Sequence, residues 1–433
     1  MLLEYSVDNF RSFKDEAFLE LRPTKTKAIN RFPNNFVRLG TGEKVLKDLV
    51  IVGENAGGKS NFVESLGFLR DLFVRMDVEC HSYTNTINSS NLVFADDGSK
   101  TASLEKSNTT QSFSIEVALV DMTYFYVLKI DGLGVLEEKL SYRKKRTGQS
   151  NTVFVQMRTR TRTCDSCDSA SDCDKGAGSS NSACLGYSIE IVNGDGPLPV
   201  EEMERLYDVQ SLGRRPMLSW LSAIGELHCR RVVDWIVNDL VVAYGPSGRL
   251  ADMRVEPDDL FSLMASEEYL SIVQLIDGSI VEVIPDRERP FMESVVVREN
   301  ASGKRFNRQV KDDSAGVRQF LAWSVYIYQV VYQGKTVVAD EVDSLINPML
   351  SDKVIAFING SDHHGQFIFT THNIFNLTLR TYMKEQIYIV SKDSETLESS
   401  LYSVADFDEI RYDVKEELYE FYLKGMLGGT VNA

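Results

Sequence analysis

The chain has 433 residues, 43% hydrophobic and 25% charged, a composition that is typical of a large folded protein and excludes a disordered one. Its 63 acidic residues exceed its 47 Lys and Arg residues, and the formal net charge of −16 does not attract nucleic acid in bulk. No apolar run is long enough to cross a membrane, and the first residues lack the pattern of a signal peptide. We therefore expect a cytoplasmic protein without a membrane partner, whose six cysteines are reduced or bind metal.

The first elements predict a strand, a loop and a helix in succession. Alternating apolar residues over 3–21 indicate a strand or hairpin at the edge of a sheet. The β-branched run Leu49–Val52 stops at Gly53 and is typical of a buried strand. Beyond Ser60 the apolar period becomes helical, at Phe62, Leu66, Leu69 and Phe73.

The rest of the chain predicts further strands and helices in four parts. Residues 111–142 alternate as strands do, residues 200–275 are mainly helical in pattern, and strands return near 279–298. A long helix is expected from Ser314 to about Tyr332. Three buried strands should follow, at Thr336–Ala339, Phe367–Thr370 and Ile387–Val390. The parts are residues 1–142, a Cys-rich surface insertion over 143–186, a mainly helical part over 187–289, and residues 290–433.

The loop between the first buried strand and its helix fits the phosphate-binding pattern G-x-x-x-x-G-K-[ST]. Its glycines allow several backbone N–H groups to face one anion at the positive end of the helix. Lys59 would reach the phosphates, and the Ser60 hydroxyl would ligate Mg²⁺. A chance Gly-rich turn is the alternative, which the strand and helix on either side disfavour. The expected nucleotide-binding residues are Gly53, Glu54, Asn55, Ala56, Gly57, Gly58, Lys59, Ser60 and the adjacent Asn61.

Two later strands end in residues that suit phosphate chemistry. Asp340 would hold the Mg²⁺, and Glu341 is placed to activate an attacking water. His372 follows the next strand and suits a sensor of the terminal phosphate, although a lone loop histidine is the plainer reading. We expect the His363-His364 pair, in a polar loop, to be solvated.

Ser314 and Gly316 lie at the start of the predicted long helix. The free N–H groups and the Ser314 hydroxyl would form a second anion site there. An ordinary helix N-cap is the alternative, and the two readings are compatible.

These segments, in this order, resemble those of the ABC-type ATPase heads, a group that includes the SMC and RecF proteins. The opening Asn9–Phe13 also looks like the first strand of that group. More closely, the chain is similar to the RloA-like and AriA-like ATPase subunits of bacterial phage-defence systems, relatives of the ATPase half of OLD nucleases. The resemblance covers roughly residues 1–140 and 290–433, including the tail Phe421–Gly425.

The resemblance implies an α/β fold: an ABC-ATPase head with an antiparallel β subdomain, a parallel P-loop core sheet and a helical subdomain. It makes Gly53–Ser60 the Walker A motif, Asp340-Glu341 the Walker B motif and His372 the switch histidine. Ser314–Gly316 stands where the signature lies, and Asp343 falls in the D-loop. In such families the signature of one subunit completes the ATP site of another, which implies a homodimer or higher oligomer that hydrolyses ATP.

The sequence departs from the usual family pattern at three places. Asn55–Gly58 has Ala56 where the family has a glycine, the signature lacks a second consecutive glycine, and Asn347-Pro348 replaces His-Pro. These changes leave each chemical role in place, so ATP binding is the firmer expectation and the rate of hydrolysis stays open.

The insertion carries cysteines and basic residues. Four thiolates could hold a structural Zn²⁺, and a loop with reduced cysteines is the alternative. The four are Cys164, Cys167, Cys173 and Cys184. Cys80 and Cys229 are expected to be buried apolar groups. Basic residues at 143–146 and at Arg158, Arg160 and Arg162 suit either a contact with nucleic acid or an acidic protein or, as we favour, the solvated face of a hairpin.

Two functions follow from the resemblance. The first is the ATPase subunit of an antiphage defence complex, which senses infection through a phage protein and controls a partner effector, with a Toprim-type nuclease as the relatives' example. The alternative is a RecF-like or SMC-like DNA repair ATPase. About 250 residues without heptads separate Ser60 from Ser314, which excludes a long coiled coil.

Overall fold

The computed structural model describes most of the chain, with gaps. The described residues are 1–23, 28–75, 77–80, 110–131, 134–144, 148–160, 185–191, 213–243, 255–341, 347–412 and 417–428. No helix in these ranges is long and apolar enough to span a bilayer.

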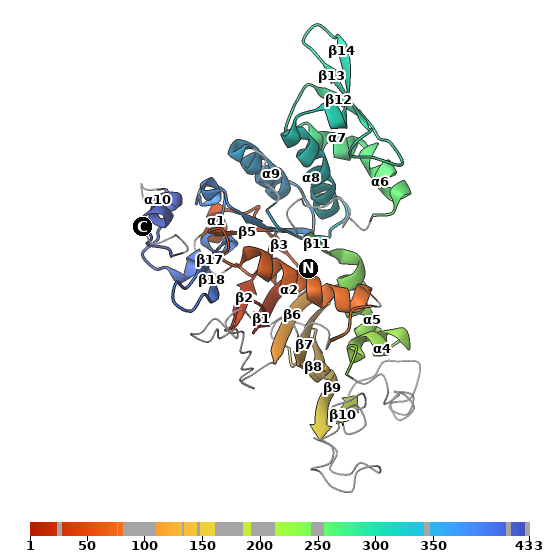
Figure 1. Cartoon of the computed structure of the whole chain (residues 1–433), viewed down its shortest axis with the longest axis vertical. Helices are drawn as coiled ribbons and strands as arrows, with labels where there is room; N and C mark the ends of the chain where they lie inside the picture. The colour runs from red at the N-terminus through yellow and green to blue at the C-terminus, as the bar shows by residue number, and fades with distance from the viewer. Residues whose placement is uncertain are drawn as a thin grey trace, which may run out of the picture.

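A six-stranded sheet forms the middle layer of the molecule (Figure 1). Its order is β11 (Leu240–Ala243), β15 (Thr336–Ala339), β16 (Gln366–Thr371), β5 (Asp48–Gly53), β17 (Ile387–Lys392) and β18 (Ser399–Ser403). The first five strands are parallel, and β18 is antiparallel to β17. All six residues of β5 are buried, because Leu49 and Ile51 pack on one side of the sheet and Val50 and Val52 on the other.

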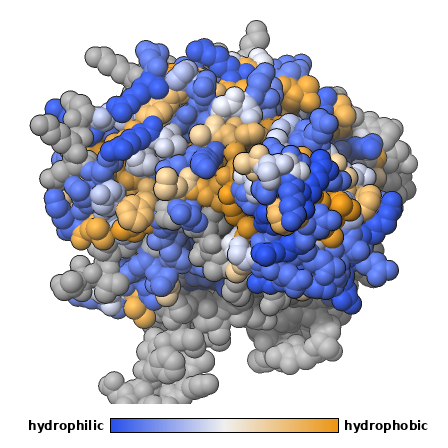
Figure 2. Space-filling model, turned by 90° about the horizontal axis from the view of Figure 1, so that it is seen from above, coloured by the Kyte–Doolittle hydropathy of each residue, from blue (hydrophilic) through white to orange (hydrophobic). Residues whose placement is uncertain are grey.

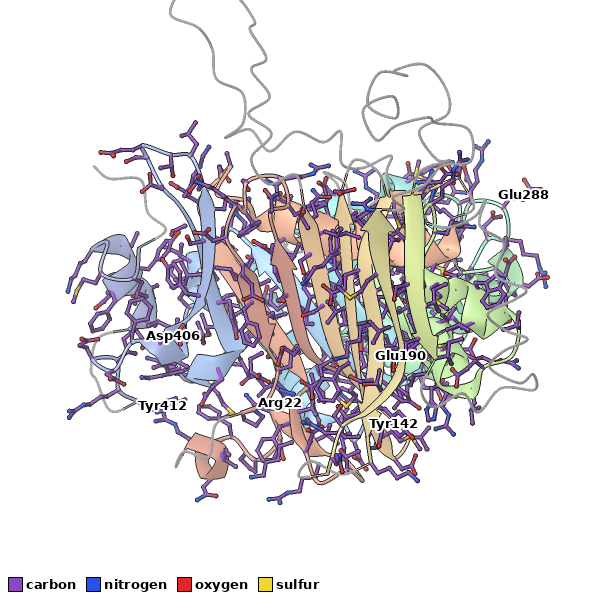
Figure 3. All side chains as sticks on the ribbon, turned by 90° about the horizontal axis from the view of Figure 1, so that it is seen from below. Arg22, Tyr142, Glu190, Glu288, Asp406 and Tyr412 are labelled. Carbon is purple, nitrogen blue, oxygen red and sulfur yellow. The ribbon has the colours of Figure 1, made fainter. Side chains whose placement is uncertain are left out.

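A seven-stranded antiparallel sheet lies on one side of this layer, and Figure 3 views the molecule from that side. Helix α2 (Lys59–Val74) packs between the two sheets, with Phe62, Leu66 and Leu69 in the shared core. The order of the sheet is β10 (Leu185–Ile191), β9 (Asn151–Arg160), β8 (Gly134–Arg143), β7 (Met122–Asp131), β6 (Gln111–Leu119), β1 (Leu2–Asp8) and β2 (Ala17–Glu20).

Helices cover the other face of the middle sheet (Figure 1). Their apolar residues form one cluster with Val50, Val52 and the inward side chains of β15 and β16. The helices are α6 (Pro257–Met264), α7 (Glu267–Val273), α8 (Ala315–Val331), α9 (Pro348–Gly360) and α10 (Leu418–Leu423). A small sheet of β12 (Ile280–Ile284), β13 (Val295–Glu299) and β14 (Arg305–Gln309) extends from α7 and α8 at the top of Figure 1.

Shorter elements complete the described chain. Helices α4 (Met217–Ala223) and α5 (Leu227–Asp234) pack beside the seven-stranded sheet, and α5 continues into a π-helical turn, Trp235–Asp239. The remaining elements are α1 (Ala28–Arg31), β3 (Phe36–Arg38), β4 (Lys44–Leu46) and 3-10 turns at Val310–Asp312, Ile374–Asn376, Lys384–Gln386 and Val404–Asp406.

The predicted α/β class with a parallel core sheet is confirmed, but several strands were missed, among them β9, β10 and β11. β11 lies in a segment expected to be helical, because a four-residue apolar run fits a buried helix as well as a strand. β9 and β10 extend the antiparallel sheet from within and just beyond the predicted surface insertion. The division into four parts itself stays a prediction.

The expectation that His363 is solvated is wrong. Its side chain is buried, with Nε2 2.9 Å from the Ile358 carbonyl and Nδ1 accepting from the Gly365 N–H. Burial lowers the pKa of His363 to about 4, so the ring is neutral near pH 7. The ring joins the end of α9 to the start of β16 and is structural.

A buried polar network holds the start of β5. The Gln386 side chain donates to Asp48 Oδ1 (2.9 Å) and accepts from the Asn35 amide (2.8 Å). Asn359 of α9 lies beside the same carboxyl group. Burial raises the pKa of Asp48 from its ordinary value of 3.8 to about 7.

We predict that Asp48→Asn relieves a pH-dependent loss of stability. The folded chain holds a proton on Asp48 between about pH 4 and pH 7 that the unfolded chain releases, so wild-type stability falls through that window. The amide carries no charge and removes this term. Urea denaturation should show the variant gaining about 2 kcal/mol relative to wild type between pH 5 and pH 8. A difference that stays constant with pH would contradict the assignment.

Candidate functional site

The phosphate loop sits where the sequence places it, between the carboxyl end of β5 and the first turn of α2. Gly58 precedes the helix with φ of 116°, a left-handed conformation that glycine adopts readily. A Cβ on Gly58 would lie 2.4 Å from Ser399 Oγ, and one on Gly53 would lie 2.5 Å from the Val390 carbonyl oxygen. Both glycines are therefore required by close packing.

Ala56 also has a left-handed backbone, with φ of 61°. This conformation is strained in residues with a Cβ. Ala56 is the residue that replaces the usual glycine, so the loop keeps the glycine-like backbone shape at that position although the residue has changed. The alanine at this position therefore costs conformational stability.

Two serines from distant segments support the loop from behind. Ser12 follows β1 and Ser399 begins β18, and their hydroxyl oxygens are 2.8 Å apart. Ser399 Oγ also lies 2.6 Å from the Gly57 carbonyl oxygen, and the Asn61 side chain donates to Ser12 Oγ at 2.7 Å. Sequence analysis missed both serines as site residues, since Ser399 belongs to no motif and Ser12 marked only a resemblance.

The Lys59 side chain is almost fully buried, 3% exposed, at the centre of the site. Its ammonium donates to the carbonyl oxygens of Gly53 and Glu54, both at 2.9 Å, and lies 3.1 Å from His372 Nδ1. Burial lowers the pKa of Lys59, while Glu341 and other nearby carboxylates favour its charged form. The lysine is thus held by the loop and by the histidine of a neighbouring strand.

Three side chains at the ends of β15 and β16 form the other wall. Thr370 Oγ1 donates to Asp340 Oδ1 (2.5 Å) and accepts from the Glu341 N–H (2.9 Å). Glu341 has φ of 48°, and its Oε1 lies 2.5 Å from His372 Nε2. Lys59, His372 and Glu341 therefore form one continuous chain of polar contacts. Thr370, which sequence analysis did not single out, fixes both carboxylate residues.

An arginine from the loop after β1 lies close to this wall. Arg11 forms an ion pair with Glu64 of α2, and burial raises the pKa of Glu64, which Asp340 raises further. Both Asn9 and Arg11 have a left-handed backbone, with φ of 54° and 52°. The short segment Asn9–Phe13 therefore turns tightly and places a cation and Ser12 at the site.

The predicted signature residues lie apart from the loop in the same chain. Ser314 is the N-cap of α8, accepting from the Val317 N–H at 3.3 Å, and is exposed, while Gly316 is partly exposed. No hydrogen bond or ion pair between described residues joins Ser314 or Gly316 to Gly53–Ser60. Asp343 lies outside the described residues. An open helix end of this kind can meet a ligand or another subunit.

The residues present fit a nucleotide with Mg²⁺. The loop leads directly into the N-terminus of α2, whose first backbone N–H groups have no partner within the helix and favour an anion. Ser60 and the buried carboxylate of Asp340 are oxygen donors, which Mg²⁺ prefers, and such sites usually complete the shell with phosphate oxygens and water.

The predicted Zn²⁺ site and the predicted basic cluster lie partly or wholly outside the described residues. The four cysteines of the insertion lie outside the described residues, so the Zn²⁺ site stays a prediction. Within the described ranges no cluster of His, Cys, Asp or Glu could hold a metal. Cys80 and Cys229 are both fully buried, as expected. Arg143 pairs with Glu43 and Glu116, and Arg158 pairs with Asp131, so these two basic side chains are neutralised on the sheet.

Comparisons with known proteins agree with this geometry. Residues 49–377 match a family model described as "AAA domain, putative AbiEii toxin, Type IV TA system". The match spans more than half of the chain, from β5 to the turn after His372, and the chain belongs to this family of AAA-domain proteins. Its nucleotide-binding ATPase fold is therefore established. No curated protein matches.

Among the solved structures to which the chain is similar are SMC heads. The chain is 12% identical to the SMC head domain from Thermotoga maritima, with a TM-score of 0.38, 93% of this chain and 98% of that one being covered. An SmcHead bound to the C-winged helix domain of ScpA gives 11% identity and a TM-score of 0.43, with 93% and 97% covered. An Smc head bound to the C-terminal domain of ScpA, derived from Pyrococcus furiosus, gives 13% identity and a TM-score of 0.39. The match covers 93% of this chain and 96% of that one.

We predict that Ala56→Gly stabilises the protein. Glycine removes the left-handed strain at φ of 61°, and its larger unfolded-state entropy offsets only part of the gain, so urea denaturation should show about 1 kcal/mol more stability. Ala265→Gly is the matched control, because Ala265 is exposed with φ of −83° and should lose stability slightly. Equal losses in both variants would refute strain at Ala56.

Proposed function

We propose that this chain hydrolyses ATP at the site formed by Gly53–Ser60, Asp340, Glu341 and His372. The observation that carries the proposal is the polar chain Lys59–His372–Glu341, which joins the phosphate loop to the ends of two parallel strands. A buried lysine, a carboxylate and a histidine in one line suit a reaction at the terminal phosphate of a nucleotide.

Each residue would have a distinct role in hydrolysis. Lys59 neutralises phosphate charge, and Glu341 accepts the proton of the attacking water. His372 contacts both and senses the terminal phosphate through a hydrogen bond. Ser60 and Asp340 would hold Mg²⁺, and the ion would neutralise charge on the phosphate oxygens.

The exposed signature supports self-association. Ser314 and Gly316 open to solvent at the N-terminus of α8, and they would complete the ATP site of a second copy. The chain would then form a homodimer or higher oligomer with ATP between subunits. Hydrolysis would loosen that assembly and make ATP a conformational switch.

The proposed biological role is that of an ATPase subunit in an antiphage defence complex in the cytoplasm. The family description names a toxin–antitoxin system, and within the described ranges no group of three or more His, Cys, Asp or Glu residues could hold a metal. The chain would sense a phage protein and control a separate effector, such as a Toprim-type nuclease. The alternative is a RecF-like or SMC-like repair ATPase, which the pairing of Arg143 and Arg158 disfavours on that face.

We predict that Glu341→Gln retains ATP binding, lowers the hydrolysis rate by about 10²–10⁴-fold and stabilises the ATP-bound oligomer. The amide keeps an oxygen to accept from His372 and cannot take a proton. Phosphate release and sedimentation velocity with ATP measure the two effects. Glu288→Gln is the control, because Glu288 is exposed at the edge of the molecule in Figure 3 and should change neither. Wild-type turnover by Glu341→Gln would show that Glu341 is not the base.

An electrophoretic shift assay separates the two biological roles. We expect the isolated protein to bind duplex DNA weakly at physiological salt, with no increase when ATP is added, since its net charge is −16. Tight, ATP-dependent binding of duplex DNA would favour the repair function instead.

A further inference from the structure

The strand β14 is exposed over its first four residues at one end of the molecule. It forms the edge of the three-stranded sheet, and among the described residues it pairs only with β13. Arg305, Phe306, Asn307 and Arg308 are all exposed, with Phe306 49% exposed. Figure 1 shows the β13–β14 hairpin extending beyond the helices, away from the middle sheet.

The free edge of β14 presents a known set of backbone groups. The Val310 N–H donates to Ser294 O, and the Lys304 carbonyl accepts from the Asn300 N–H, so these residues face β13. Antiparallel pairs alternate in direction along a strand. Arg305, Asn307 and Gln309 therefore point their N–H and C=O groups outward, where they can pair with another strand.

The charge of this edge is positive. Lys304 forms no ion pair with a described residue, and its ammonium lies 5.2 Å from the centre of the Phe306 ring. Arg308 is 59% exposed and lies 3.9 Å from Asp313, at the limit of an ion pair. Arg305 and Lys311 are instead paired with Glu299 and Glu293.

We propose that β14 is a docking site for an extended acidic segment of a partner protein, which adds as a fourth strand to this sheet. The outward N–H and C=O groups supply the pairing, Phe306 supplies apolar contact, and Lys304 and Arg308 select for acidic side chains. This edge carries all three features together.

A protein segment fits this edge better than duplex DNA does. DNA binding needs many uncompensated cations, and most of the neighbouring arginines are paired: Arg298 with Asp277 and Asp313, Arg287 with Asp258, and Arg305 with Glu299. Figure 2 views the molecule from this end and shows hydrophilic and hydrophobic residues interspersed, with no continuous apolar face. Backbone pairing therefore has to supply most of the affinity, and Lys304 and Arg308 supply the selection for acidic side chains.

The docking edge is connected to the proposed signature. Arg298 of β13 bonds Asp313 at 2.7 Å, and the Ser314 N–H donates to the same carboxylate at 2.9 Å. A strand added to β14 would restrain the hairpin and hence the N-terminus of α8. Any effect of this restraint on ATP turnover rests on the proposed function, whereas docking itself does not.

The test uses the full chain and a fluorescein-labelled decapeptide of alternating Glu and Val, followed by fluorescence anisotropy. Asn307→Pro removes an outward N–H and spares the bonds to β13, as proline does on edge strands. We expect this variant to bind the peptide at least tenfold more weakly than wild type. Asn307→Thr is the matched control and should bind within twofold. Unchanged circular dichroism and melting temperature of both variants would show that folding is intact.

Charge and competitor experiments complete the test. The double variant Lys304→Glu, Arg308→Glu should also weaken binding at least tenfold, and a Lys–Val decapeptide should not bind. The proposal is overturned if wild type does not bind the Glu–Val peptide, or if Asn307→Pro binds it normally. It is also overturned if a duplex DNA binds with a dependence on Lys304 and Arg308 but not on Asn307, or if Asn307→Pro abolishes self-association without peptide. None of these readouts requires ATP hydrolysis.

Discussion

A buried positive charge governs the organisation of this molecule. Lys59 is removed from water between two sheets, and its charge is tolerable only because two loop carbonyl oxygens and the His372 ring contact it and carboxylates lie nearby. These partners come from three strands of the parallel sheet. The strand order β15-β16-β5 is therefore what brings the site together, since adjacent parallel strands end at the same edge.

Strain is concentrated around the same charge. Ala56 and Glu341 both have left-handed backbones on opposite walls of the site, and Arg11 has one in the segment behind it. Such conformations persist only where surrounding contacts fix them, as the Ser12–Ser399 pair and Thr370 do here. The rigid core, with β5 buried on both faces, supplies that support.

The candidate nucleotide site and the proposed docking edge lie in different parts of the molecule. The phosphate loop and its carboxylates lie at the junction of the two large sheets, whereas the basic edge β14 lies at the far end of the helical part. Asp313 and α8 connect them, because Asp313 bonds Arg298 on one side and precedes the N-cap Ser314 on the other. Under the two proposals, a partner docked on β14 and a nucleotide at the signature would be linked through α8.

The sequence by itself determined the local units: strand β5, the loop after it, α2, the strand ends at Asp340 and His372, and the cap at Ser314. These depend on periodicity, glycine and capping within a few residues. Only the tertiary structure decided that β11 joins the core sheet, that His363 is buried, and that Ser399 supports the loop. Those features arise from contacts between residues far apart in the chain, and no local pattern encodes which distant partner a short strand or a lone serine will meet.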